Sequence, residues 1–141
     1  MKFDLTGDNM KYPKTSKYGI PHFNSYACIG DSVSWTPKDG NPYGLTITAR
    51  LEHDSDTKPT DFECYSASKI KEWENDEWSF VGVVLSVHKD GVTLDNHAAS
   101  LWGIECNYNA RSNLYFAQVC KDLESEALAV GNEVLANLKG E

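Results

Sequence analysis

A polar stretch at residues 52–63 concentrates side chains that could do chemistry, with five acidic residues and one histidine. The pair Asp54 and Asp56, followed by further carboxylates, could hold a hard cation through oxygen ligands, and His53 could add a nitrogen ligand. The glycine and the final glutamate of a calcium-binding loop do not fall where that loop needs them. A solvated loop is therefore the favoured interpretation, and no metal ion or other cofactor is predicted.

A second acidic run, at residues 72–77, contains Trp73 and is followed by Trp78. Residues 54–80 carry eight acidic residues against three lysines, more than half of the formal charge of −8. Carboxylates beside tryptophans can form a docking edge for a basic partner, or simply a soluble turn between a helix and a central strand. The residues predicted to bind a partner are Asp54, Asp56, Asp61, Glu63, Glu72, Glu74, Asp76 and Glu77, with Trp73, Trp78 and Trp102 as aromatic contacts.

Two arrangements contain catalytic residue types without a catalytic pattern. Gly30-Asp31-Ser32 matches the nucleophile motif of a class of serine esterases, but that chemistry needs the serine at a strand-to-helix turn and a late Asp-x-x-His pair. Here the serine enters a strand pattern, and no such pair follows. The candidates for acid–base chemistry have no distinguishing spacing: His53 or His97, with Asp54, Asp95 or Glu105 as a partner. No catalytic residue is predicted, although a small enzyme of unknown reaction remains an alternative.

Net charge narrows the classes of partner. Nucleic-acid binding needs a surface of lysine and arginine that neutralises phosphates, whereas this chain of 141 residues is acidic. Arg50 and Arg111 are its only arginines. The sequence therefore predicts a protein partner with a basic surface and no direct contact with nucleic acid.

The cellular compartment follows from the cysteines and from hydropathy. The four cysteines are scattered without a Cys-x-x-Cys pair, which favours small buried side chains in a reducing cytosol. No apolar run approaches the roughly 20 residues of a membrane span, and the N-terminus lacks the apolar core of a signal peptide. A cytoplasmic protein without membrane association is predicted.

The chain divides into an irregular N-terminal arm at residues 1–26 and a single α+β domain at residues 27–141. The arm has four lysines against two aspartates and little apolar periodicity. Such a segment could lie back on the acidic surface of its own chain, reach a neighbouring chain, or be poorly ordered.

Hydrophobic patterning predicts an antiparallel sheet of four to six strands. Alternation with period two predicts a hairpin of strands at about 31–36 and 45–51. Residues 79–87 are apolar and β-branched enough to be buried on both faces, which places them in the middle of the sheet. Residues 91–94 pair back against them. Residues 101–106 form another strand, whose alternation predicts Trp102, Ile104 and Cys106 on one face. Gly82 is expected at a bulge or under a tryptophan ring.

Two helices complete the predicted architecture. Ser66 or Ser68 can cap a short helix that runs to about Trp73, before the central hairpin. Asn113 can cap a long C-terminal helix whose apolar stripe packs on one face of the sheet, and Gly131 either ends this helix or weakens its last turns.

The runs Trp73-x-Asn-Asp-Glu-Trp-x-Phe-x-Gly-Val-Val84 and Ser100-Leu-Trp-Gly-Ile-Glu105 resemble small uncharacterised proteins encoded by tailed phages and related mobile elements. The similarity covers most of the chain after residue 27. It implies a phage context, with the cytoplasm of the host cell as the compartment, and it carries no catalytic residues and no established activity.

Three classes of function are compatible with these observations. The favoured one is a phage-type accessory protein whose acidic surface binds a host or defence protein, as a counter-defence inhibitor or a mimic of nucleic-acid charge. The second is a protein that binds or sequesters a small ligand such as a nucleotide, with tryptophans to stack a base and Arg50, Arg111 or the lysines of the arm to meet phosphates. The third is a small enzyme of unknown reaction. A role in virion assembly is a further alternative, and a homodimer is compatible with any of these classes.

Overall fold

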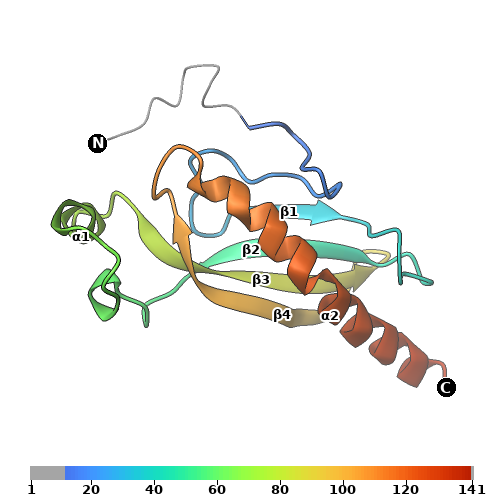
Figure 1. Cartoon of the computed structure of the whole chain (residues 1–141). Helices are drawn as coiled ribbons and strands as arrows, with labels where there is room; N and C mark the ends of the chain where they lie inside the picture. Colours follow the sequence, from blue (N-terminus) through green and yellow to red (C-terminus); the bar gives the residue numbers. More distant parts are fainter. Residues whose placement is uncertain (1–11, 141) are drawn as a thin grey trace.

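A computed structural model describes residues 12–140 of the chain. The elements, in chain order, are β1 (Ser32–Trp35), β2 (Thr46–His53), a 3-10 turn (Pro59–Asp61), α1 (Ala67–Glu74), β3 (Ser79–Lys89), β4 (Val92–Cys106), a second 3-10 turn (Ser112–Leu114) and α2 (Tyr115–Leu138). The four strands form one sheet in chain order, and every neighbouring pair is antiparallel. Helix α2 crosses one face of the sheet, and α1 lies beyond one end of it (Figure 1). The predicted α+β class is confirmed, with four strands, a C-terminal helix on one face and a short helix before the central hairpin.

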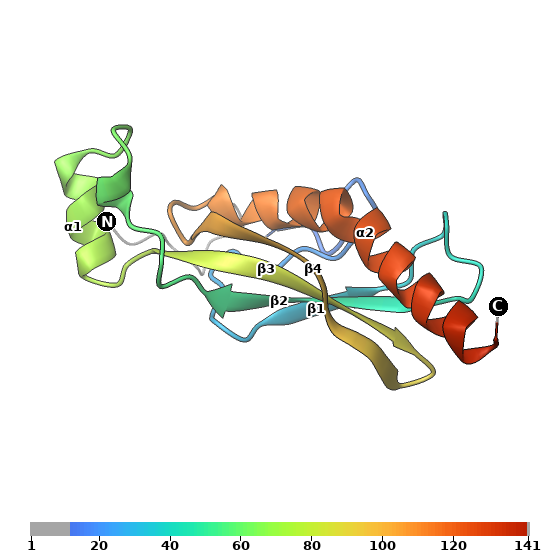
Figure 2. The same cartoon turned by 90° about the horizontal axis from the view of Figure 1, so that it is seen from below.

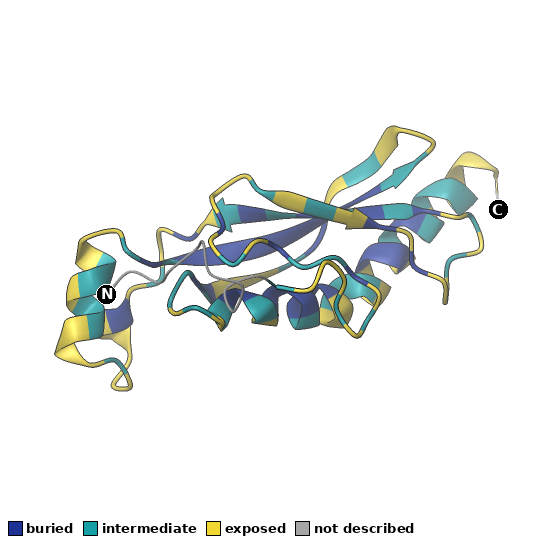
Figure 3. Ribbon diagram, turned by 90° about the horizontal axis from the view of Figure 1, so that it is seen from above, coloured by how far each residue is buried: buried dark blue, intermediate teal, exposed yellow. Residues whose placement is uncertain are grey.

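The core lies between α2 and the sheet, where the helix packs mainly on β3 and β4. Val81, Val83 and Leu85 of β3 are fully buried and alternate with Gly82 and Val84 on the other face of the strand. The burial pattern shows a continuous buried band along β3 and the sheet-facing side of α2 (Figure 3). The prediction that this strand lies inside the sheet is therefore confirmed. Among residues 12–140, no helix combines the length and apolar composition that crossing a membrane requires.

The second half of the sheet differs from the prediction. Residues 92–106 form one continuous strand of 15 residues, whereas two shorter strands were expected. They pair with a β3 of 11 residues, and the excess is taken up at three shifts of register. A bulge adds residues to one strand without ending its pairing, so residues 95–100, which join the two predicted strands, belong to one bulged strand.

One bulge, at Trp102 and Gly103, reverses the predicted side-chain alternation. Gly103 has a φ of +75°, a conformation that glycine adopts at little cost. As a result Ile104 is buried in the core, whereas Trp102 packs against Gly82 on the opposite face of the sheet. A Cβ placed on Gly82 would lie 2.2 Å from Cε3 of Trp102, so the predicted approach of a tryptophan ring to this glycine is confirmed.

Asn113 does not cap the long helix as predicted. It is fully buried in the 3-10 turn before α2, where its amide nitrogen donates to the carbonyl oxygens of Asn24 and Ser25, both at 3.2 Å. Its side-chain oxygen accepts the backbone N–H of Asn107 at 2.8 Å. Tyr115 thus starts α2 without a side-chain cap, because Asn113 joins the arm to the end of β4.

The described part of the arm, residues 12–26, contains no helix or extended strand and packs along the first turns of α2. Ile20 and Phe23 are buried, and the rings of Phe23 and Phe116 meet edge to face at 5.3 Å. The Tyr12 hydroxyl donates to the carbonyl oxygen of Ala110 at 2.8 Å. The lysines at positions 2 and 11 lie outside the described residues.

The cysteines fall into two pairs by burial. Burial raises the pKa of the Cys106 and Cys120 thiols to about 12, as expected for small core side chains. Cys28 and Cys64 are exposed, which contradicts the prediction for these two residues. All four are free thiols.

Gly131 lies inside α2, at a position where the helix backbone is in close contact with Leu45 and with Val87 of β3. A Cβ at this position would lie 2.8 Å from Cδ1 of Leu45 and 2.8 Å from Cγ2 of Val87. Alanine normally gains about 1 kcal/mol over glycine in a helix. Here we expect Gly131→Ala to lose about 1–2 kcal/mol of stability, because the stiff Val87 side chain on an interior strand cannot move away.

Urea denaturation checks this expectation, with Ala129→Gly on the exposed side of the same helix as the control. The control loses about 1 kcal/mol from propensity alone. Stabilisation by Gly131→Ala would contradict the close packing.

Candidate functional site

The predicted docking edge forms one end of the molecule, which we call the acidic lobe and define as residues 54–77. The lobe contains the 3-10 turn at Pro59–Asp61 and α1, and it stands beyond the end of the sheet (Figures 1 and 2). Helix α1 starts as predicted, because the Ser66 hydroxyl accepts the backbone N–H of Lys69 at 3.2 Å. It ends at Glu74. Asp76, with a φ of +61°, lies in the turn that leads into β3. The lobe contains eight acidic residues and three lysines.

An aromatic cluster holds the lobe to the sheet. Trp78 and Phe80 at the start of β3 are each 2% exposed. The ring of Trp78 lies 4.9 Å from that of Tyr108 and 5.4 Å from that of Tyr65. Its indole N–H donates to the carbonyl oxygen of Lys69 at 2.9 Å, which ties α1 to the strand. Because α1 has no fully buried residue of its own, these contacts fix its position.

Lys69 adds a second tie between α1 and the body of the protein. Its ammonium donates to the carbonyl oxygen of Tyr108 at 2.6 Å and lies 4.1 Å from the centroid of that ring. It also pairs with Glu72 at 2.9 Å, and this hydrogen bond lowers the pKa of the Glu72 carboxyl. Glu72 is therefore engaged within the lobe.

Asp54 joins the lobe to β4. The residue is 7% exposed, and its carboxylate accepts the hydroxyl of Thr57 at 2.7 Å and the backbone N–H of Gly103 at 2.8 Å. The backbone N–H groups of Asp56 and Thr57 also donate to it, at 3.0 and 3.2 Å. Burial alone would raise the pKa of Asp54, but these hydrogen bonds outweigh it and lower the pKa. The Asp54 carboxylate is therefore occupied by hydrogen bonds from its own loop and from Gly103, and it does not face a partner.

Two aromatic side chains stay partly exposed where the lobe meets β3. Phe62 is 49% exposed, and its ring lies 6.2 Å from that of Phe80. Trp102 is 41% exposed and covers Gly82, which lies two residues along the same face of β3 from Phe80. We call these two side chains the Phe62–Trp102 patch.

The other predicted contacts divide by exposure. Trp73 and Glu77 are half-buried, and Trp78 is buried in the aromatic cluster. The carboxylates that face solvent are those of Asp56, Asp61, Glu63, Glu74 and Asp76. Sequence reasoning missed Phe62 because the residue lies in a polar loop without periodicity, and only its contact with Phe80 reveals its role.

The residues considered for acid–base chemistry do not assemble into a catalytic arrangement. His97 Nε2 lies 2.9 Å from the hydroxyl oxygen of Ser100, which also accepts the indole N–H of Trp102 at 3.1 Å. The bond between Asp95 and His97 is with the backbone N–H of the histidine and not with its ring. His53 is exposed at the end of β2. Within residues 12–140, no group of three or more His, Cys, Asp or Glu side chains could hold a metal ion.

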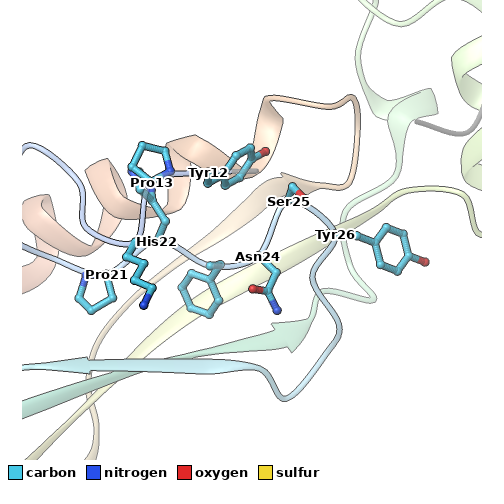
Figure 4. Close-up of a pocket in the computed structure, with 9 residues that line it drawn as sticks. Tyr12, Pro13, Pro21, His22, Asn24, Ser25 and Tyr26 are labelled. Atoms are coloured by element: carbon cyan, nitrogen blue, oxygen red, sulfur yellow. The ribbon is translucent and has the colours of Figure 1, made fainter. Parts of the chain in front are cut away.

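A cationic region lies along the arm and the start of α2. One hollow of about 600 Å³ is lined by the arm itself, including Lys14 and His22 (Figure 4). A second, of about 530 Å³, is lined by Lys17, His22, Arg111 and Tyr115. In the described part of the chain, neither hollow is lined by an aspartate or glutamate. The only signal of this region in the sequence is the excess of lysine in the arm.

No protein-family model matches the chain, and neither the curated proteins nor the solved structures yield a match. The resemblance to phage-encoded proteins therefore stays a prediction.

Proposed function

We propose that this protein acts by binding, with the acidic lobe and the Phe62–Trp102 patch as its interaction surface for a basic region of another protein. In the phage context that the sequence suggests, the partner is a host or defence protein, and binding inhibits it. The observation that carries the proposal is the Asp54–Gly103 bond, because it ties the loop that bears the exposed Asp56 to β4 beside the half-exposed Trp102. Apolar anchors surrounded by charge are typical of protein interfaces, where the anchors supply affinity and the charges speed association.

The lobe is held rigidly enough to present this surface. Trp78 and Tyr108 hold α1 in place through their hydrogen bonds with Lys69, so the exposed carboxylates of Glu74 and Asp76 extend from a backbone of fixed position. A preformed surface loses less conformational entropy on binding than a flexible acidic loop. A fixed row of carboxylates is also what a mimic of nucleic-acid charge needs.

Capture of partners from lysate of the cell that carries the gene, with three forms of the protein as bait, tests the proposal. The lobe variant Asp61→Asn/Glu63→Gln/Glu74→Gln removes three exposed charges. The matched control Asp122→Asn/Glu126→Gln/Glu133→Gln removes three exposed charges from α2. We expect a partner that binds the wild type and the control and is lost with the lobe variant, with affinity lowered about tenfold or more.

The dependence of partner binding on salt, and its competition by DNA or RNA, distinguish the possible outcomes further. Binding through the lobe weakens as salt rises, because exposed charges are screened. Competition by DNA or RNA would identify the partner as a nucleic-acid-binding protein and support charge mimicry. Equal loss of the partner with both triple variants, or binding that is insensitive to salt, would contradict the assignment of the lobe.

A further inference from the structure

We infer that the hollow between the arm and the start of α2 is a binding site for a small ligand that joins an anionic group to an aromatic ring, of which a nucleoside monophosphate is the simplest form. The site goes beyond the proposed function, because none of its lining residues belongs to the acidic lobe. Its volume of about 530 Å³ falls in the range of small-molecule sites.

The charge of the site selects an anion. The chain has 21 acidic residues against 13 basic ones, yet among residues 12–140 the side chains that line this hollow include Lys17 and Arg111 and no carboxylate. Lys14 lines the adjoining hollow, which shares Pro13 and His22 with the first and to which the described residues likewise contribute no carboxylate. A cationic surface in an acidic protein favours an anionic ligand over a cationic or neutral one.

Arg111 is the side chain best placed to hold the anionic group. It is exposed, and among the described residues its guanidinium has no hydrogen bond or ion pair. Arg50, by contrast, pairs with Glu52 at 2.6 Å and donates to the carbonyl oxygen of Asn96 at 2.8 Å. A guanidinium presents two parallel donors to a phosphate or carboxylate, and Lys17 adds a second positive charge.

The aromatic part of the ligand is selected by Tyr115. This residue lies four positions after Arg111, in the first turn of α2, and is 52% exposed. Among residues 12–140 its ring has no aromatic partner, whereas the rings of Tyr65 and Tyr108 pack against Trp78. An exposed ring beside a guanidinium is the arrangement that stacks a nucleobase while its phosphate is held.

A neighbouring hollow indicates the orientation in which the ligand binds. Arg111 and Tyr115 also line a cavity of about 520 Å³ that contains Glu105, whose carboxylate accepts the Tyr65 hydroxyl at 2.5 Å. Glu105 repels a phosphate but can accept a hydroxyl or amino group. The anionic group therefore lies on the Lys17 side of Arg111, and the ring lies over Tyr115 towards Glu105.

His22 provides a further polar contact. It lines both cationic hollows, and its Nδ1 atom is buried without a hydrogen-bond partner among the described residues. Burial lowers the pKa of its imidazole, so the ring is neutral at pH 7. A neutral imidazole can offer one donor and one acceptor to a ligand.

Calorimetric titration of the full chain with adenosine, guanosine, cytidine and uridine 5′-monophosphates tests the inference. Inorganic phosphate and the matching nucleosides serve as partial ligands. We expect at least one monophosphate to bind more tightly than both of its parts. Arg111→Gln and Tyr115→Ala should each weaken that binding about tenfold, which corresponds to the loss of one charged hydrogen-bonding group or one stacking contact.

Two controls keep the result specific to this site. Lys38→Gln removes a positive charge from an exposed turn, and Val92→Ala removes an exposed apolar side chain at the start of β4; neither should change the affinity. Amide chemical shifts should move at Lys17, Arg111 and Tyr115. Absence of binding by all four monophosphates, equal binding by phosphate alone, or insensitivity to Arg111→Gln would overturn the inference.

Discussion

Replacing Trp78 with alanine is expected to lower the free energy of unfolding by about 3–5 kcal/mol and to loosen the acidic lobe. The side chain is 2% exposed at the centre of the aromatic cluster, so its removal leaves a cavity between Tyr65, Phe80 and Tyr108. It also removes the donor to the carbonyl oxygen of Lys69. Since α1 has no buried residue of its own, we expect the helix to lose its fixed position before the sheet unfolds.

Urea denaturation and amide hydrogen exchange measure the two parts of this expectation. Exchange should rise in α1 and stay slow in β3, where the strand is paired on both sides. Trp102→Ala is the matched control, because it removes a tryptophan that is 41% exposed and should cost clearly less. Unchanged protection of α1 in Trp78→Ala would show that another contact positions the lobe.

The strands and helices that could be predicted are those whose pattern is local. Residues 79–87 are apolar on both faces, and a strand with this composition fits only the interior of a sheet. Ser66 precedes a short apolar period and accepts the N–H of Lys69, which is a contact within one helical turn. Both features depend on residues close together in the sequence, so their patterns were sufficient.

The features that could not be predicted depend on contacts between distant residues. The stretch at residues 95–100 contains four polar residues and separates two predicted strands, and only its pairing with β3 makes it part of one bulged strand. Asn113 has the chemistry of a helix cap, but it binds the carbonyl oxygen of Asn24 instead. In both cases tertiary contacts outweigh local preference.

The candidate site shows the same division. The negative charge at residues 54–77 is evident from composition, and the structure places this stretch in a single lobe. Composition does not distinguish the buried Asp54 from the exposed Asp56 two residues later. Nor does it place Phe62 and Trp102, which are 40 positions apart, on the same face of β3. The proposed interaction surface therefore depends on the bulge at Gly103, which the alternating pattern of residues 101–106 does not predict.

Asp54→Asn is expected to lower the free energy of unfolding at pH 7 by about 1–3 kcal/mol, because one oxygen of a buried carboxylate becomes an NH₂ group that faces donors. The four hydrogen bonds to this carboxylate come from Asp56, Thr57 and Gly103. The oxygen of the asparagine side chain can accept some of these hydrogen bonds, but the donors that face its NH₂ group lose their acceptor. Asp56→Asn, which changes an exposed carboxylate, is the matched control and should have little effect.

The pH dependence of the difference in unfolding free energy between wild type and Asp54→Asn distinguishes the effect of the negative charge of Asp54 from the effect of its size and shape. Its pKa in the folded protein is lower than the ordinary value of 3.8, so the carboxylate contributes its full stabilisation above pH 3.8. That contribution is lost as the pH falls through the lower folded value. The gap in unfolding free energy between wild type and Asp54→Asn should therefore be constant from pH 5 to 8 and should narrow below about pH 4.

Partner binding provides the functional measure of the same substitution. Asp54→Asn leaves the five exposed carboxylates of the lobe in place and loosens their connection to β4 beside Trp102. If the partner needs the carboxylates and the Phe62–Trp102 patch together, its affinity falls although no contact residue has changed. Unchanged affinity in a destabilised Asp54→Asn protein would show that the lobe binds without the patch.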